Sequence, residues 1–159
     1  MKNPALLLFG LFLLAGCFKE KYENPYDLIE DPGGDTLSTA TLDPKSLSGL
    51  HANIFRPTCA NSGCHDGTFE PDFRTVQSTF HTLVNHPIVK NDPQGTFSVR
   101  VKPGDVGASL LIARLTYDID GNSGTMPLIV EPDSDWLEKK EQYIQDIKDW
   151  IAAGAEEGL

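Results

Sequence analysis

The clearest helical periodicity in the chain lies near its C-terminus. Between residues 135 and 153, apolar side chains recur at the three- and four-residue spacing of one helix face, and Gly154 stands where a helix C-cap belongs. The apolar face consists of Trp136, Tyr143, Ile144, Ile147, Trp150 and Ile151. A helix with such a face must bury it, so the pattern predicts a packing partner elsewhere in the chain.

A helix that follows Asp43-Pro44 offers that partner. It carries Leu47, Leu50 and Ile54 on one apolar stripe. We expect it to end before Pro57, because proline lacks the N–H group that continues a helix. Since both helices need to bury a stripe, the first and last helices are expected to meet.

Shorter elements are predicted between these two helices. Residues 75–85 predict a helix, which Asn85-His86-Pro87 ends; its apolar positions are Val76, Phe80, Leu83 and Val84. Residues 97–101 favour extended backbone, and residues 102–105 predict a turn. A short helix is expected next, and its apolar residues are Leu110, Leu111 and Leu115.

The first sixteen residues have the pattern of a leader peptide. Lys2 supplies a positive charge, and the apolar run over residues 5–14 is too short to span a bilayer, which takes about 20 residues. The run ends in Leu14-Ala15-Gly16-Cys17, which resembles the bacterial lipobox. That resemblance implies that residues 1–16 are removed as a signal peptide and that Cys17 is acylated. An ordinary secretory signal is the alternative.

The rest of the chain divides into a tether and one folded domain. Residues 17–43 mix charge with Pro, Gly, Ser and Thr and have no sustained period, which predicts a flexible linker. Residues 44–159 are expected to form one domain, because 159 residues with 40% apolar content suffice for one small core. The protein is expected in the bacterial cell envelope, lipid-anchored to a membrane and facing the periplasm. Whether the anchor sits in the inner or the outer membrane stays open.

Charge limits the choice of partners. The formal net charge is −10, and loss of Lys2 with the leader makes it one unit more negative. Nucleic acid and anionic lipid surfaces are therefore poor partners. The acidic surface either steers the protein toward a basic docking patch or is simply solvated.

The candidate chemistry begins at Cys59-Ala60-Asn61-Ser62-Gly63-Cys64-His65. Two thiols on one short loop, with an imidazole directly after the second, are the arrangement required for a covalent haem: each sulfur adds to one vinyl group, and the imidazole ligates the iron. The usual spacing has two residues between the cysteines, and here there are four. The turn-forming residues 61–63 can bulge outward while both sulfurs stay in reach. A disulfide between Cys59 and Cys64 is the alternative, and a structural zinc site is less favoured because a second ligand pair is missing.

A second candidate ligand lies far along the chain. Once the leader is removed, Met126 is the only methionine, and it sits in a glycine-rich loop followed by Pro127. Such a thioether suits the sixth position of a haem iron. Met126 as a simple gap-filler is the alternative role. The other histidines also compete for the sixth position, with His86 the most credible; they are His51, His81 and His86.

These segments together resemble the successive blocks of class I-type monohaem cytochromes c, in the form common among bacterial lipoproteins. The blocks occur in the family's order and cover roughly residues 46–155. They are Ile54-Phe55-Arg56-Pro57-Thr58-Cys59, Cys64-His65-Asp66-Gly67, Val101-Lys102-Pro103-Gly104-Asp105, Ser109-Leu110-Leu111, Met126-Pro127 and Ile147-Lys148-Asp149-Trp150-Ile151-Ala152-Ala153-Gly154-Ala155. The resemblance implies an all-α cytochrome c-like fold, with the first and last helices crossing near one covalent haem c. It also implies that a proline carbonyl orients His65, and Pro71 is the candidate, with Pro87 as a competitor.

The sequence thus predicts an electron-transfer protein and no enzyme. Cys59 and Cys64 hold the haem, His65 and Met126 ligate its iron, and redox proteins of unidentified kind are the donor and acceptor. Two other hypotheses remain. One is a non-haem lipoprotein interaction module stabilised by a Cys59–Cys64 disulfide. The other is a haem enzyme or gas sensor, which needs a vacant or displaceable sixth position.

Overall fold

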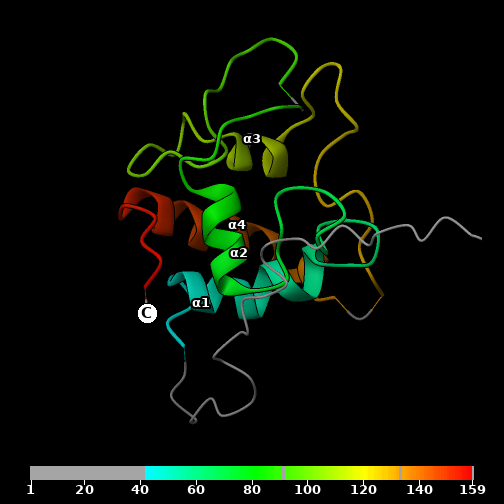
Figure 1. Ribbon diagram of the computed structural model, residues 1–159. Helices are drawn as coiled ribbons and strands as arrows, with labels where there is room; N and C mark the ends of the chain where they lie inside the picture. The colour runs from blue at the N-terminus through cyan, green and yellow to red at the C-terminus, as the bar shows by residue number, and fades with distance from the viewer. Residues whose placement is uncertain (1–41, 91, 133, 159) are drawn as a thin grey trace, which may run out of the picture.

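Helices joined by long loops make up the described part of the chain (Figure 1). The computed structural model describes residues 42–90, 92–132 and 134–158. The elements are α1 (Leu47–Leu50), the π-helix η3 (His51–Cys59), α2 (Val76–Leu83), α3 (Leu110–Thr116) and α4 (Trp136–Ala152). No strand occurs among these residues, so the described part is all-α, as predicted. The leader 1–16, Cys17 and nearly all of the tether 17–43 lie outside the described residues.

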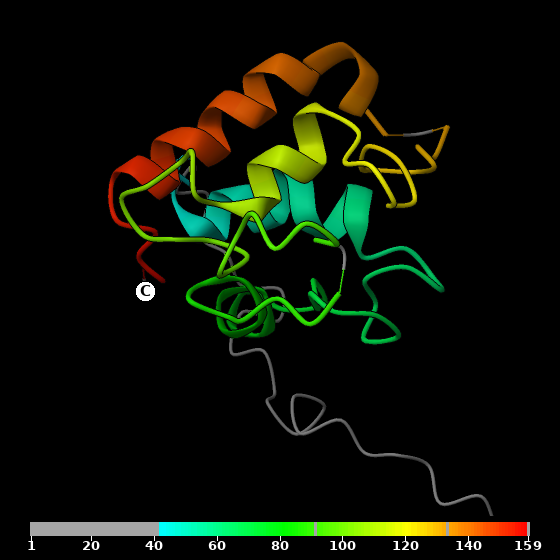
Figure 2. The same cartoon turned by 90° about the horizontal axis from the view of Figure 1, so that it is seen from above.

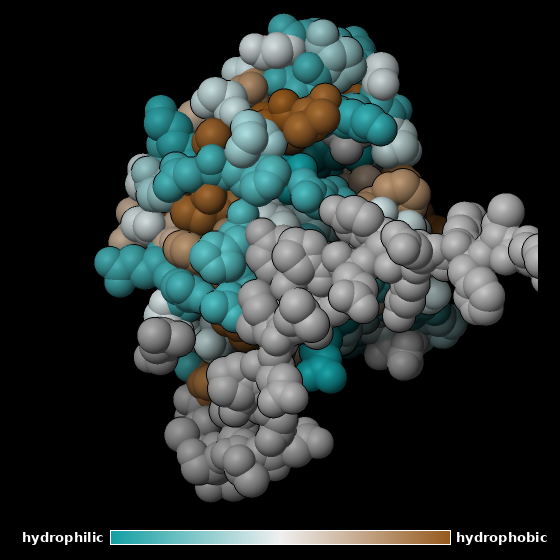
Figure 3. Space-filling view, in the orientation of Figure 1, coloured by the Kyte–Doolittle hydropathy of each residue, from teal (hydrophilic) through white to brown (hydrophobic). Residues whose placement is uncertain are grey.

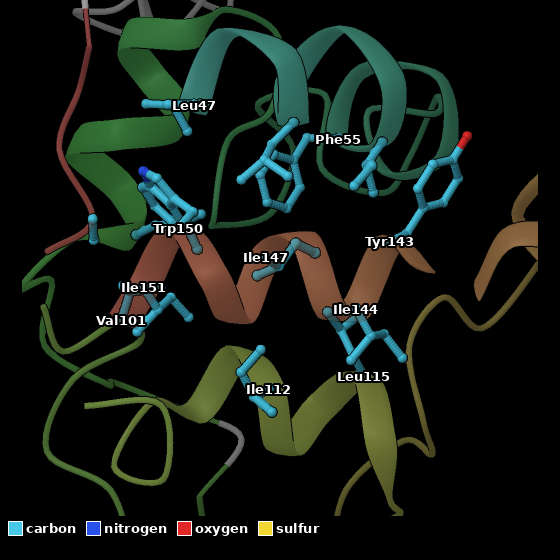
Figure 4. Packing of buried hydrophobic residues seen from close by; sticks show 14 of the residues in the cluster. Leu47, Phe55, Val101, Ile112, Leu115, Tyr143, Ile144, Ile147, Trp150 and Ile151 are labelled. Atoms are coloured by element: carbon cyan, nitrogen blue, oxygen red, sulfur yellow. The ribbon is translucent and has the colours of Figure 1, made fainter. Parts of the chain in front are cut away.

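Against α4 pack α1, η3 and α3, whereas α2 packs on α1 and η3. Figure 4 shows Leu47 and Phe55 on one side of α4, and Ile112 and Leu115 of α3 on the opposite side. Ile147 is fully buried in the same cluster. All the apolar residues of α4 that the periodicity selected are buried, which confirms the predicted face. No helix among the described residues is long and apolar enough to cross a bilayer.

The first and last helices meet, as predicted. Leu47 of α1 belongs to the same buried cluster as Trp150 and Ile151 of α4. Just before α1, the Lys45 ammonium group forms an ion pair with the Asp149 carboxylate at 2.5 Å. An exposed pair of this kind contributes little free energy, so apolar burial accounts for most of the attraction between the two helices.

The prediction that the first helix ends before Pro57 is wrong. After α1 the chain widens into η3, which continues through Pro57 to Cys59. In a π-helix each N–H group pairs with the carbonyl five residues earlier, and the Ala60 N–H donates to Phe55 O at 3.0 Å in this way. The wider turn gives the proline ring the room that an α-helix denies it. As a result, Cys59 lies directly at the end of a helix that packs on α4.

The middle of the chain follows the predictions. The predicted helix over 75–85 is present as α2, which begins with a capping box between Thr75 and Ser78. The extended segment over 97–101 does not form a strand; Val99 and Val101 take part only in isolated β-bridges. A strand needs a ladder of consecutive pairs, whereas each bridge here joins single residues. The turn at 102–105 is present, and α3 follows it.

The end of α4 has the geometry that Gly154 predicts. The Gly154 N–H donates to Ile151 O at 3.0 Å, and the Ala155 N–H donates to Trp150 O at 2.9 Å. These two bonds form a Schellman motif, in which a residue of positive φ reverses the chain; Gly154 has φ 112°. The reversal folds the buried Ala155 back onto the core.

Candidate functional site

Cys59, Cys64 and His65 lie on one tight loop at the end of η3. The Cys64 N–H donates to Asn61 O at 2.9 Å, and the His65 N–H donates back to Cys59 O at 3.2 Å. The predicted turn over residues 61–63 is therefore present, with its tip exposed. The chain reversal brings the backbone of His65 next to that of Cys59, although four residues separate the two cysteines.

The two thiols have different surroundings. Cys59 packs against the main apolar cluster, and burial raises the pKa of its thiol to about 12, with Cys64 adding to the effect. Cys64 is exposed. Both are free thiols in the structure. Together they can attach a group that lies partly against the core and partly toward solvent.

His65 is hydrogen-bonded to the carbonyl group of Pro71, the contact that the resemblance implies. Nδ1 of His65 lies 2.9 Å from Pro71 O. Because a carbonyl oxygen can only accept, Nδ1 carries the proton and Nε2 keeps the lone pair of the ring. Burial lowers the pKa of His65; the Pro71 carbonyl opposes this effect, and the charges of Arg100 and Arg114 add to it. A neutral imidazole with its lone pair on Nε2 is the form that ligates a metal. Whether His65 does so stays a prediction.

Aromatic packing fixes the orientation of the imidazole ring. The rings of His65 and Phe73 meet edge to face with centroids 5.1 Å apart. Phe73 in turn stacks on Phe55 of η3 at 4.8 Å, and both phenylalanines are buried. His65 is therefore held between a carbonyl group and the core, which reduces the freedom of its ring before any ligand binds.

The segment that returns from His65 to α2 is anchored by Asp72. The Asp72 N–H donates to Thr82 Oγ1 at 2.9 Å, and the buried Asp72 carboxylate accepts from Arg74 Nη2 at 2.8 Å. The Arg74 guanidinium lies against Gly67, where an added Cβ atom would approach its Cζ to 2.7 Å. Pro71 is thus carried by a segment with its own polar anchor.

Met126 lies on the loop between α3 and α4. Its side chain is half-buried and packs against the main apolar cluster. Its N–H donates to Arg114 O at 2.7 Å, which ties the loop to α3. Figures 1 and 2 both show this yellow-to-orange loop on the same side of the molecule as the loop that follows η3. The fold therefore places the two segments that carry the candidate axial ligands on a common side.

Arg114 is a residue of this region that the sequence analysis missed. It lies in α3 and is only 6% exposed. Its Nη2 donates to Ser123 Oγ at 3.2 Å, whereas Nη1 has no hydrogen-bond partner in the described part of the chain. The signal in the sequence is a single cation inside the apolar run of α3, Leu110-Leu111-Ile112-Ala113-Arg114-Leu115.

The other histidines have different surroundings. His51 is buried, with Nε2 3.1 Å from Phe73 O. His81 is exposed, and its ring contacts Phe80. His86 is half-buried, with Nδ1 3.0 Å from Pro87 O and Nε2 3.7 Å from Glu70 Oε2. Pro87 therefore bonds to its neighbour His86, and Pro71 is the proline whose carbonyl contacts His65.

Exposed apolar side chains flank both candidate ligand segments. Phe69 follows His65, and Leu128 and Ile129 follow Met126; all three are more exposed than is usual for their type. On the face drawn in Figure 3, hydrophilic side chains predominate and apolar patches are small. Among the described residues no three His, Cys, Asp or Glu side chains are arranged to hold a metal ion by themselves.

Comparison with known proteins identifies no relative. No family model matches the chain, and neither the curated proteins nor the solved structures contain a match. Function is therefore inferred from the residues and their geometry.

Proposed function

We propose that this protein is a lipid-anchored c-type cytochrome that carries one covalent haem and passes single electrons between redox proteins. The observation that supports this most directly is the loop from Cys59 to His65. Its two thiols and its imidazole come from one chain reversal, and the imidazole presents the lone pair of Nε2 because Pro71 takes Nδ1. A cytochrome c-like arrangement of the helices is part of the same proposal.

The residues present fit a haem c. Cys59 and Cys64 are free thiols, as thioether formation requires. The porphyrin supplies four nitrogen ligands, so the iron needs only two from the protein, and no larger cluster of ligating side chains is required. The exposed Phe69, Leu128 and Ile129 offer apolar surface for the flat macrocycle or for a docking protein.

Met126 is the sixth ligand in this proposal. Met126 is half-buried, and its loop is tied to α3 by the hydrogen bond from the Met126 N–H to Arg114 O. The positive charge of Arg114 in turn contributes to lowering the pKa of His65. His86 has the weaker claim. Nε2 of His86 faces Glu70, which precedes Pro71 in the chain. Pro71 lies on the Nδ1 side of the His65 ring, whereas an iron would bind on the Nε2 side.

The chain's own residues then have separate tasks. When bound, the haem supplies the one-electron chemistry. His65 and Met126 fill both axial positions, which disfavours binding and activation of small molecules and leaves electron transfer. Phe73 and Pro71 keep the imidazole in one orientation, so little reorganisation accompanies each change of charge. The acidic surface favours partners with a basic docking face.

The experiment is expression of the full chain in a bacterial host that has c-type maturation machinery. We expect a red protein whose haem stays attached after denaturation, and whose intact mass shows one haem, loss of residues 1–16 and acylation. Cys59→Ser and Cys64→Ser should each leave one thioether link, and the double variant should lose covalent haem. Cys17→Ser is the matched control, because the same substitution should release the protein from the membrane and keep the haem.

A second measurement tests the axial ligands. Met126→Ala should remove the sulfur-to-iron absorption band of the ferric protein, while His86→Ala should leave that band unchanged. The ferrous wild-type protein should bind carbon monoxide poorly, since both axial positions are filled. A colourless product with a Cys59–Cys64 disulfide would refute the proposal in favour of an interaction module. Rapid binding of carbon monoxide would instead indicate a sensor or an enzyme.

A further inference from the structure

Arg114 carries a buried N–H group that has no acceptor in the described part of the chain. The residue is 6% exposed, and while Nη2 donates to Ser123, no atom of the described residues accepts from Nη1. Buried polar groups are almost always hydrogen-bonded, and an unpaired group on a cation is especially costly. The guanidinium therefore indicates an acceptor that the described residues do not provide.

The position of Arg114 limits what that acceptor is. Its carbonyl group accepts from the Met126 N–H at 2.7 Å, and its side chain donates to Ser123 of the same loop at 3.2 Å. The guanidinium of Arg100, by contrast, is already satisfied by Glu70 and by Thr82 O, each at 2.7 Å. Arg114 is thus a cation beside the loop that carries Met126. The charge of Asp118 acts on it, but no carboxylate of the described residues accepts a hydrogen bond from its Nη1.

A carboxylate is the acceptor that a guanidinium binds best, through a planar pair of N–H donors. A free anion would have to lose its water to reach a side chain as buried as Arg114. A haem attached at Cys59 and Cys64 carries its own carboxylates, the propionates, on one edge of the porphyrin. Those groups enter the site with the haem and need no separate binding event.

We propose that Nη1 of Arg114 donates a hydrogen bond to a propionate of the haem, and that the same side chain, held by Ser123, positions that edge of the haem beside the Met126 loop. Arg114 is therefore a positioning residue, and its charge raises the reduction potential, because a nearby cation disfavours the more positive ferric iron. This inference rests on the proposed function.

The test uses the haem-loaded full chain and three variants. Arg114→Met removes the charge and the donors, Arg114→Lys keeps the charge and loses the planar fork, and Lys102→Met removes an exposed cation that pairs with Asp105. Lys102→Met controls for net charge, since an exposed charge is screened. For each protein we would measure haem content, the propionate bending band in the resonance Raman spectrum, and the equilibrium with a redox couple of known potential.

The expected result is full haem content in all variants, since Arg114 forms no bond to the porphyrin ring. Arg114→Met should shift the propionate band and move the redox equilibrium at least about tenfold toward the ferric form, which is about 59 mV for one electron. Arg114→Lys should shift the band with a smaller change in potential. Lys102→Met should change neither.

Each other outcome overturns a distinct claim. An unchanged propionate band in haem-loaded Arg114→Met and Arg114→Lys refutes the contact and leaves the cytochrome proposal intact. If Arg114→Met fails to accumulate, Arg114→Lys decides, because an unchanged band there is sufficient to refute the contact. A wild-type protein without haem refutes the proposed function and this inference together.

Discussion

Gly67→Ala tests how the segment behind His65 is held. Gly67 has φ 89°, in the left-handed region that costs a residue with a Cβ atom about 1–2 kcal/mol. The new methyl group would also lie 2.7 Å from Cζ of Arg74. The guanidinium would have to move away, and that movement would break its 2.8 Å bond to the buried Asp72 carboxylate.

The magnitude follows from these two effects. A hydrogen bond to a charged group contributes about 1.5–3 kcal/mol, and the Asp72 carboxylate would keep only its bond from the backbone N–H of Arg74. Together with the backbone cost, Gly67→Ala should lower the free energy of unfolding by about 2.5–5 kcal/mol. Gly63→Ala is the matched control. Gly63 has φ 77° in the same loop, but a Cβ atom there meets nothing within 4 Å. It should cost only the backbone term, about 1–2 kcal/mol.

Denaturant unfolding of the two variants and the wild type, at equal haem content, measures the difference. Equal losses in Gly67→Ala and Gly63→Ala would refute the reasoning, because the cost would then be backbone strain alone. Arg74→Ala provides a further check. In that background Gly67→Ala should cost no more than Gly63→Ala, since the group that the methyl displaces is gone.

Three further predictions concern the helices. Ile147→Ala should lower the free energy of unfolding by about 3–4 kcal/mol in denaturant titrations, because Ile147 is fully buried and its truncation leaves a cavity in the core. Leu137 is exposed, so the control Leu137→Ala should cost less than about 0.5 kcal/mol. Thr75→Ala removes the side chain that caps α2 and should cost about 1 kcal/mol, seen as a lower thermal midpoint. Asp135→Asn tests a pH dependence. Hydrogen bonding to Lys139 lowers the pKa of the Asp135 carboxyl in the folded protein. The ionised carboxylate therefore stabilises the fold at neutral pH, and this contribution is lost as the pH falls through the folded-state pKa. The variant should therefore be less stable than the wild type at neutral pH, by no more than about 1 kcal/mol for so exposed a pair, and equal to it in acid; an equal difference at both pH values would contradict this.

The long amphipathic helix α4 could be predicted because burial of one helix face is enough to explain the spacing of its apolar residues. The stripe from Trp136 to Ile151 can leave water only as one helix face, so α4, its partner α1 and the Gly154 cap all followed from spacing. Pro57 had two possible consequences. It ends an α-helix, but the packing of Phe55 and Ile54 into the core favours continued helix, and the wider π-helix satisfies both requirements.

Some residues of the candidate site could likewise be predicted from the sequence, and others could not. Cys59, Cys64 and His65 are close in sequence, so their order could be recognised without a fold; it predicts covalent haem chemistry, with a Cys59–Cys64 disulfide as the alternative. Pro71 is also near, and the hydrogen bond that the resemblance implied is present, although its role toward a haem stays a prediction. For Arg114 the sequence offers only a cation within an apolar run, because its burial depends on the loop that carries Ser123 and Met126 folding back over α3.

What the amino-acid sequence determined by itself is local: which segments are helical, where α4 ends, and which loop carries two thiols and an imidazole. Periodicity and adjacent chemistry are properties of neighbouring residues, so they can be recognised without a fold. Only the tertiary structure decided that Met126 is tied to α3 and that Arg114 is buried with a donor unpaired among the described residues. Each of these depends on contacts between segments distant in sequence or on burial from water, and no spacing rule encodes them.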